Sequence, residues 1–165
     1  MLRAVNLGGG STIPKGALMK IGEDCGFRQL RTFIASGNLL FTSDEAAVAV
    51  ERKVFAGVAE YFGRPVPIYV RTAKEMAAVA AGNPFPDRPG NRVTAHFLSG
   101  EPKADHVADV KGVEDEKLVA GKREIYIAFG NGMGHSKLRL PADAIGTARN
   151  MNSVGKMAEL LAGME

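Results

Sequence analysis

Polar and basic side chains gather at four places where a predicted strand or helix ends, and each group is suited to holding an anion. The first is the loop Asn6–Thr12, in which Gly8 and Gly9 precede a predicted helix start. Glycines let backbone N–H groups approach an anion, and a helix N-terminus adds a favourable dipole. Lys15 falls in the first helical turn and reaches the same place. The alternative is an ordinary strand-to-helix connection that needs glycine for positive φ.

The second group is the tip of a predicted β-hairpin in the stretch RTFIASGNLLF. Two strand-forming runs, Arg31–Ala35 and Leu39–Thr42, flank the turn Ser36-Gly37-Asn38. The turn offers hydrogen bonds to a ligand, and Arg31 offers a positive charge. Tight-turn chemistry alone also explains these residues, so both interpretations stay open.

Two further groups lie in the C-terminal half. Ser136 and Lys137 follow the glycine-rich loop Gly130–His135, whose N–H groups can hold a phosphate at a helix start. Arg149 can offer two parallel donors to a carboxylate or phosphate, and Asn150 follows it. The alternatives are a long surface turn and an arginine that ties the last helix to the body. We predict that the loops of the four groups converge on one polar cleft.

Neither a metal centre nor a cofactor is expected from the residue pattern. The chain has three histidines, far apart in sequence, and one cysteine, which is too few for a zinc cluster. The glycine spacing matches neither the dinucleotide fingerprint nor the P-loop. His135 lies in a candidate loop without an acidic neighbour in sequence, so a Ser–His–Asp arrangement is unsupported. Cys25 is interpreted as a buried structural residue.

Composition indicates a globular protein of the cytoplasm. The 165 residues are 45% hydrophobic and 24% charged, with a net charge of +3, as in ordinary soluble domains. No apolar run approaches the roughly 18 residues of a membrane span. A single cysteine without an export signal favours a reducing compartment. The mild positive charge suits an anionic ligand but falls short of the dense basic stripe of a duplex-DNA binder.

Hydrophobic periodicity and turn residues place the four groups on a regular succession of elements. The first half is predicted to hold a strand at Leu2–Leu7, a helix capped by Ser11 or Thr12 with Pro14 in its first turn and Gly26 after its end, the hairpin, a helix from Ser43 to Gly63, and a strand at Val66–Arg71. The face of the second helix expected to be buried comprises Val48, Phe55, Val58, Ala59 and Phe62. The order β-α-β-β-α-β is that of the ferredoxin-like split β-α-β domain.

The second half repeats much of this order. Its predicted elements are helices at Ala73–Ala81, Pro102–Val110 and Met151–Gly163, a strand at Val93–Leu98, and a hairpin formed by Lys117–Gly121 and Glu124–Phe129. Residues 147–153 are interpreted as a loop in which Asn152 or Ser153 caps the last helix. We therefore predict an α+β fold of two ferredoxin-like halves packed together, residues 1–82 and 83–165.

The chain resembles the bacterial family catalogued as domain of unknown function 1697. The opening Arg3-Ala4-Val5-Asn6-Leu7-Gly8-Gly9 is similar to its R-G-[IV]-N-V-G-G start, and later motifs follow in the family's order, among them Arg31–Asn38, Asn83-Pro84-Phe85, Gly121–Tyr126, Ser136-Lys137-Leu138 and Gly146–Asn150. The resemblance implies a ferredoxin-like α/β architecture and no established activity. The family's characteristic polar positions correspond to Arg3, Asn6, Gly8, Gly9, Lys15, Arg31, Ser36, Gly37, Asn38, Ser136, Lys137, Arg149 and Asn150.

The function expected from these observations is binding of an anionic ligand, either a phosphorylated metabolite or single-stranded nucleic acid. Basic side chains would neutralise its charge, and amides and hydroxyls would orient it. One alternative is an enzyme acting on a small phosphorylated or carboxylated substrate, with His135 or a nearby carboxylate as general acid–base. The other alternative is a protein–protein adaptor whose loops hold the two halves in register.

Overall fold

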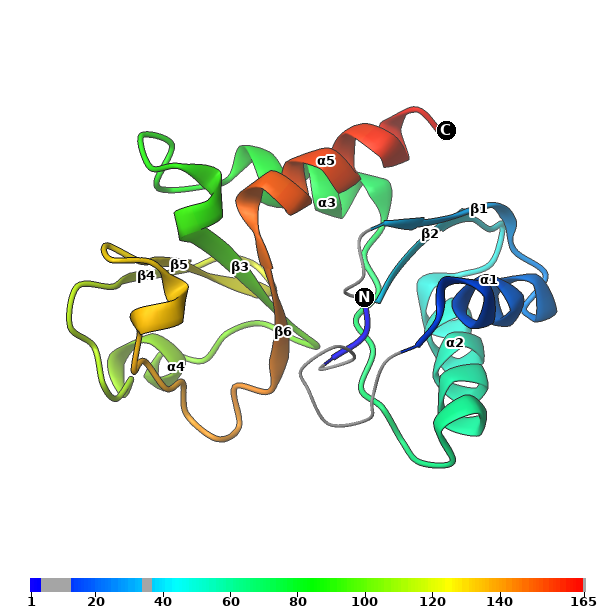
Figure 1. The fold of residues 1–165 in the computed structure, drawn as a ribbon, viewed down its shortest axis with the longest axis horizontal. Helices are drawn as coiled ribbons and strands as arrows, with labels where there is room; N and C mark the ends of the chain where they lie inside the picture. Colours follow the sequence, from blue (N-terminus) through cyan, green and yellow to red (C-terminus); the bar gives the residue numbers. More distant parts are fainter. Residues whose placement is uncertain (4–12, 34–36, 165) are drawn as a thin grey trace. The chain divides into compact units, whose positions relative to one another are not determined.

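The computed structural model describes residues 1–3, 13–33 and 37–164, and the chain divides into two compact units. Unit 1 comprises Met1–Ala73 with Glu159–Glu165, and unit 2 comprises Lys74–Ala158. In the described residues the architecture is mixed α/β, with two antiparallel sheets and five α-helices (Figure 1). The mixed α/β class is therefore confirmed, whereas a domain boundary after residue 82 stays a prediction.

The sheet of unit 1 is built around the predicted hairpin. Strands β1 (Arg28–Phe33) and β2 (Asn38–Thr42) pair antiparallel, with a register irregularity near the start of β1. The N-terminal segment lies beside the residue that precedes β2, since the Leu2 amide donates to the Gly37 carbonyl at 2.9 Å. Leu2 also forms an antiparallel bridge with Ile68. The backbone order across unit 1 is thus β1, β2, the N-terminal segment and the segment around Ile68.

Helices α1 (Lys15–Asp24) and α2 (Ala47–Phe62) lie side by side against the hairpin (Figure 1). Their hydrophobic cluster includes Ile21 and Val54. Gly26 and Gly63 follow the two helices at φ +78° and +63°, where glycine carries no Cβ penalty. Pro14 precedes the first residue of α1 instead of standing inside its first turn, because its ψ of 147° is extended.

The expected buried face of α2 is wrong at two positions. Val48 is 81% exposed and Phe55 is 40% exposed, whereas the buried residues are Val50, Val54 and Val58. The helix carries two apolar stripes, and the i, i+4 spacing of the three valines is the one turned to the core. The helix also begins at Ala47 rather than Ser43.

Unit 2 holds a four-stranded antiparallel sheet in the order β4-β5-β3-β6. Its strands are β3 (Val93–Leu98), β4 (Lys117–Ala120), β5 (Glu124–Ala128) and β6 (Gly146–Asn150). The interpretation of residues 147–153 as a loop is wrong, since Ala95 of β3 pairs with Arg149 of β6. The β6 sequence lacks hydrophobic alternation, so only this long-range pairing makes it a strand.

Both faces of the central strand β5 are covered. Ile125 and Ile127 pack in a cluster with Val107, next to α4 (Asp105–Ala108). On the opposite face the Tyr126 hydroxyl donates to the Val79 carbonyl at 3.0 Å, which holds α3 (Ala73–Ala81) to the sheet. Helix α4 is a single turn, shorter than the helix predicted at residues 102–110.

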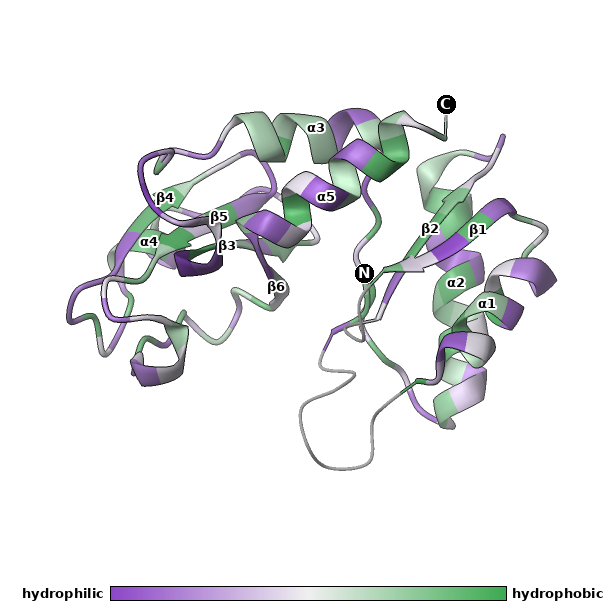
Figure 2. Cartoon of the chain, turned by 45° about the horizontal axis from the view of Figure 1, so that its top comes forward, coloured by the Kyte–Doolittle hydropathy of each residue, from purple (hydrophilic) through white to green (hydrophobic). Residues whose placement is uncertain are grey.

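The remaining elements of unit 2 are short, apart from the last helix, whose residues 159–162 are counted in unit 1. The 3-10 turns are η1 (Gly90–Arg92) and η2 (Met133–His135). Helix α5 (Met151–Ala162) carries hydrophobic and hydrophilic residues on different sides (Figure 2), and it buries Met151, Val154 and Met157. This amphipathic pattern is what the sequence predicts for a helix packed on one face.

Candidate functional site

Three of the predicted anion-binding cations lie in unit 1 and have no neutralising partner among the described residues. Arg3, Lys15 and Arg31 are exposed, and none of them forms an ion pair with a described residue. Arg3 stands in the N-terminal segment, where its amide donates to the Pro67 carbonyl at 3.0 Å. Arg31 lies in β1 opposite Leu40. Within the described part of unit 1, none of these three charges is neutralised.

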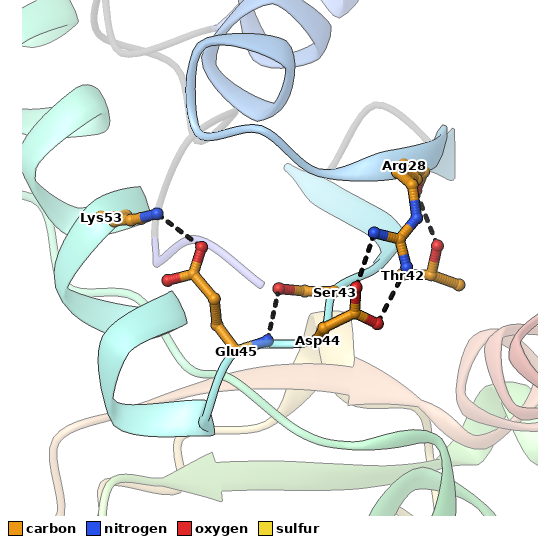
Figure 3. A network of polar contacts seen from close by, with 6 residues as sticks. All are labelled: Arg28, Thr42, Ser43, Asp44, Glu45 and Lys53. Carbon is orange, nitrogen blue, oxygen red and sulfur yellow. Dashed lines mark hydrogen bonds and ion pairs between the residues drawn. The ribbon is translucent and has the colours of Figure 1, made fainter.

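Other cations of unit 1 are neutralised by carboxylates, as Figure 3 shows. The Arg28 guanidinium donates in a fork to Asp44 at 2.8 and 2.9 Å, and Lys53 contacts Glu45 at 2.5 Å. The fork raises the pKa of Arg28 and lowers the pKa of Asp44, through hydrogen bonding first and charge second. The Arg28 fork joins the start of β1 to the segment before α2, and the Lys53 contact joins α2 to the same segment. Both contacts stabilise the fold.

At the N-terminus of α1, no described group occupies the backbone amides that an anion would bind. Lys15 is the first helical residue, and the first helical bond runs from the Leu18 amide to the Pro14 carbonyl at 3.1 Å. No described residue accepts from the amides of Lys15, Gly16 or Ala17. Pro14 offers no capping oxygen, and the first turn contains no acidic residue. The helix dipole and the Lys15 charge therefore favour an anion at the same end.

The described residues of the hairpin tip form hydrogen bonds within the chain itself. Asn38 is fully buried, and its side-chain amide donates to the Phe33 carbonyl at 2.9 Å, which closes the hairpin. Gly37 is buried at φ +72° and accepts a hydrogen bond from the Leu2 amide. The other predicted members of this cleft, Asn6, Gly8, Gly9 and Ser36, lie outside the described residues.

In unit 2, carboxylates of the chain itself hold the glycine-rich loop and the residues that follow it. The amides of Gly130 and Asn131 donate to Asp115 at 3.2 and 2.8 Å. The Ser136 hydroxyl donates to Glu116 and, with the amides of the acidic segment, lowers the pKa of that carboxyl group. Sequence reasoning missed these two acidic partners, because only the fold brings them to the loop.

Lys137 has a carboxylate partner as well. Its ammonium group lies 3.1 Å from Glu114, and both side chains are exposed. Solvent-exposed pairs of this kind are weak and exchange readily. A contact between Lys137 and an external anion therefore stays a prediction, in competition with Glu114.

Arg149 and Asn150 end strand β6 in front of α5. Arg149 is buried and donates from one nitrogen to the Thr147 hydroxyl and the Ala148 carbonyl, both at 2.8 Å. Burial lowers the pKa of Arg149 to about 10. The Asn150 side chain accepts a hydrogen bond from the Ser153 amide at 2.9 Å, so Asn150 provides the cap that was predicted for Asn152 or Ser153.

The residues considered for catalysis and metal binding form no metal-binding group among the described residues. His135 is exposed in η2, and its ring forms no hydrogen bond with a described residue. Cys25 is half-buried, and burial raises the pKa of its thiol. Over the described parts of the chain, no three His, Cys, Asp or Glu residues are grouped as metal ligands. None of the described helices is long and apolar enough to cross a membrane.

Comparison with known proteins gives a family and a fold. The family model described as protein of unknown function (DUF1697) matches residues 1–126. No curated protein matches the sequence. In structure the chain is similar to a conserved bacterial protein from Streptococcus pneumoniae, with a TM-score of 0.75 over 98% of this chain and 96% of that chain, at 20% sequence identity. At this identity the similarity shows a shared fold.

Proposed function

Since this chain belongs to the DUF1697 family of proteins of unknown function, and that family assigns no ligand, we propose that it is a binding protein for an anionic ligand. The ligand class is a phosphorylated metabolite or single-stranded nucleic acid. The described part of the proposed site lies in unit 1.

One observation carries the proposal. The first turn of α1 presents backbone amides without described acceptors, next to the ammonium group of Lys15. Amides at a helix start bind phosphate and carboxylate oxygens because they combine donors with the positive end of the dipole. Arg3 and Arg31 add exposed positive charge in the same unit. We assign Asn6, Gly8, Gly9 and Ser36 to the same site on their sequence positions.

The predicted residues of unit 2 have weaker support. Ser136 and Lys137 contact the chain's own carboxylates, and Arg149 and Asn150 hold β6 and α5. An external anion would have to displace Glu116 or Glu114 before it reached the first pair. The proposal therefore rests on α1.

We also make a proposal for the fold type of the two units and for the location of the protein in the cell. We infer that both units are ferredoxin-like. In unit 2 the first strand, β3, lies between the third and fourth strands, β5 and β6. In unit 1 the N-terminal segment lies in the same way between β2 and the segment around Ile68. The bridge at Leu2 supports this order in unit 1, and the pairing of β3 with β5 and β6 supports it in unit 2. We also propose a cytoplasmic location, which the single free cysteine supports.

Thermal denaturation with added anions tests the proposed function. Inorganic phosphate, a nucleoside monophosphate and a short oligothymidylate are the probes, because a ligand that binds only the native state raises the midpoint. Lys15→Ala should remove most of the shift. Lys20→Ala is the matched control, since it removes the same charge from the same helix, where Lys20 pairs with Asp24.

The outcomes distinguish anion binding at the start of α1 from anion binding elsewhere on the chain. Equal loss of the shift in both variants indicates nonspecific charge attraction and contradicts the site. If only Lys137→Ala abolishes the rise in melting midpoint, the ligand binds unit 2 instead. The absence of a shift with all three probes contradicts binding of these ligand classes.

A further inference from the structure

A groove of about 570 Å³ lies between α1 and α2 of unit 1. Its volume falls within the range of roughly 300 to 1,000 Å³ typical of small-molecule sites. None of the residues assigned to anion binding lines it. Its lining comprises Ala17, Lys20, Ile21, Asp24, Cys25, Lys53, Ala56, Gly57, Glu60 and Tyr61.

Small residues create this groove. A Cβ atom on Gly57 would stand 2.9 Å from Cγ2 of Ile21, so glycine is what lets the two helices approach there. Ala17 and Ala56 leave open space beside that contact and supply an apolar lining. The groove thus has an apolar floor on which a hydrocarbon or aromatic body can pack.

The two cations in the lining are already neutralised. Lys20 lies 2.8 Å from Asp24, one turn along α1. Lys53 points to Glu45, which precedes α2, at 2.5 Å (Figure 3). Each ammonium group therefore has a carboxylate partner, and the exposed Lys20–Asp24 pair is a weak one, like that of Lys137 and Glu114.

The Glu60 carboxylate and the Tyr61 hydroxyl in the lining have no hydrogen-bond partner among the described residues. The Glu60 carboxylate forms no hydrogen bond or ion pair with any described residue. Its neighbour Tyr61 is 45% exposed, and its ring meets Phe62 edge-on with centroids 5.0 Å apart. The Tyr61 hydroxyl likewise has no described partner. Glu60 and Tyr61 both line the groove. A carboxylate attracts an organic cation through its charge, and an aromatic ring attracts it through the ring quadrupole.

The thiol of Cys25 completes the lining as a neutral group. Burial raises its pKa, and the charge of Asp24 raises it further against the opposing effect of Lys53. A neutral thiol behaves as a small, weakly polar surface. The thiol adds apolar contact area. Among the charged residues of the lining, Glu60 alone has no ion-pair partner in the described part of the chain.

We propose that the groove between α1 and α2 binds a small organic ammonium ion with an apolar body. The apolar body packs on Ala17, Ala56 and the Cys25 thiol. The ammonium group donates to Glu60 and lies against the ring of Tyr61. An anionic ligand of the same size would be repelled by Glu60.

Amide chemical-shift titration of the full chain tests this proposal. The probes are phenethylammonium and 2-phenylethanol, which share an apolar body and differ in charge. We expect phenethylammonium to shift the amides of α1 and α2 and to bind at least about five-fold more tightly than the alcohol. Glu60→Gln should remove this preference. Glu51→Gln is the matched control, because it makes the same charge change on α2 outside the lining.

Each result bears on the assignment. Ala56→Leu fills the floor with a good helix former and should abolish binding of both probes. Equal affinity for the two probes would leave only an apolar groove and overturn the proposal. Shifts outside α1 and α2, no binding, or an unchanged preference in Glu60→Gln would also overturn it. Self-association of the chain through α1 and α2 without ligand would identify a second copy as the occupant instead.

Discussion

Gly57→Ala should test the close approach of α1 and α2 at Ile21. Gly57 lies inside α2, where alanine alone would improve the helix by about 1 kcal/mol. The added methyl group would stand 2.9 Å from Cγ2 of Ile21, closer than carbon atoms pack. Ile21 is buried and branched at Cβ, so its side chain cannot rotate freely away.

The net effect follows from the two opposing terms. Overpacking in a core costs about 1 to 3 kcal/mol, and the gain in helix propensity offsets about 1 kcal/mol of it. The free energy of unfolding should therefore fall by up to about 2 kcal/mol. Gly155→Ala is the matched control, since Gly155 lies inside α5 with nothing within 4 Å of an added Cβ. That variant should be stabilised by up to about 1 kcal/mol.

Urea unfolding followed by circular dichroism measures both variants. Ile21→Leu moves the branch from Cβ to Cγ at similar volume, and so removes the methyl group that the new Cβ meets. In the Ile21→Leu background, Gly57→Ala should be less destabilising by at least about 1 kcal/mol, a coupling that a double-mutant cycle isolates. If Gly57→Ala stabilises the chain as much as Gly155→Ala does, α1 and α2 do not approach as closely as described.

Two further predictions concern unit 2. Asp143 has a pKa of about 2, held down by hydrogen bonds from Lys103 first and His106 second. Because the pKa is depressed in the folded state, this stabilisation is present above the ordinary value of 3.8 and lost as pH falls through about 2. At neutral pH the Asp143→Asn variant should therefore have a lower melting temperature than the wild type. The difference between the two melting temperatures should disappear at acid pH. A difference that persists at the acid limit contradicts the assignment. Tyr126→Phe removes the buried 3.0 Å bond to the Val79 carbonyl and should lower the free energy of unfolding by about 1 kcal/mol in urea titrations, whereas an unchanged midpoint would show that the bond does not hold α3.

Elements with strong local signals were predictable from the sequence. The bounds of β3 at Val93–Leu98 and of α3 at Ala73–Ala81 agree with prediction. Gly26 and Gly63 end their helices with positive φ, as their sequence positions indicate. These features depend on the residues themselves and their near neighbours, so they need no knowledge of the tertiary structure.

Elements that depend on distant partners were not predictable. Strand β6 has no apolar alternation, and its pairing with β3 is what defines it. The buried face of α2 was ambiguous because the helix carries two apolar stripes. Packing against Ile21 and the sheet selects the stripe containing Val54 and leaves Phe55 in solvent.

The candidate site divides in the same way. The sequence by itself determined which groups can carry charge, among them Lys15, Arg31 and Lys137, and their places at element ends. Only the tertiary structure decided which of these charges are neutralised, because several ion pairs, among them that of Lys137, join residues far apart in the chain. In the folded chain Glu114 forms an ion pair with Lys137, whereas Lys15, at the start of α1, has no ion-pair partner among the described residues. Side-chain type is local information, whereas the availability of a charge to a ligand depends on every group that folding brings within reach.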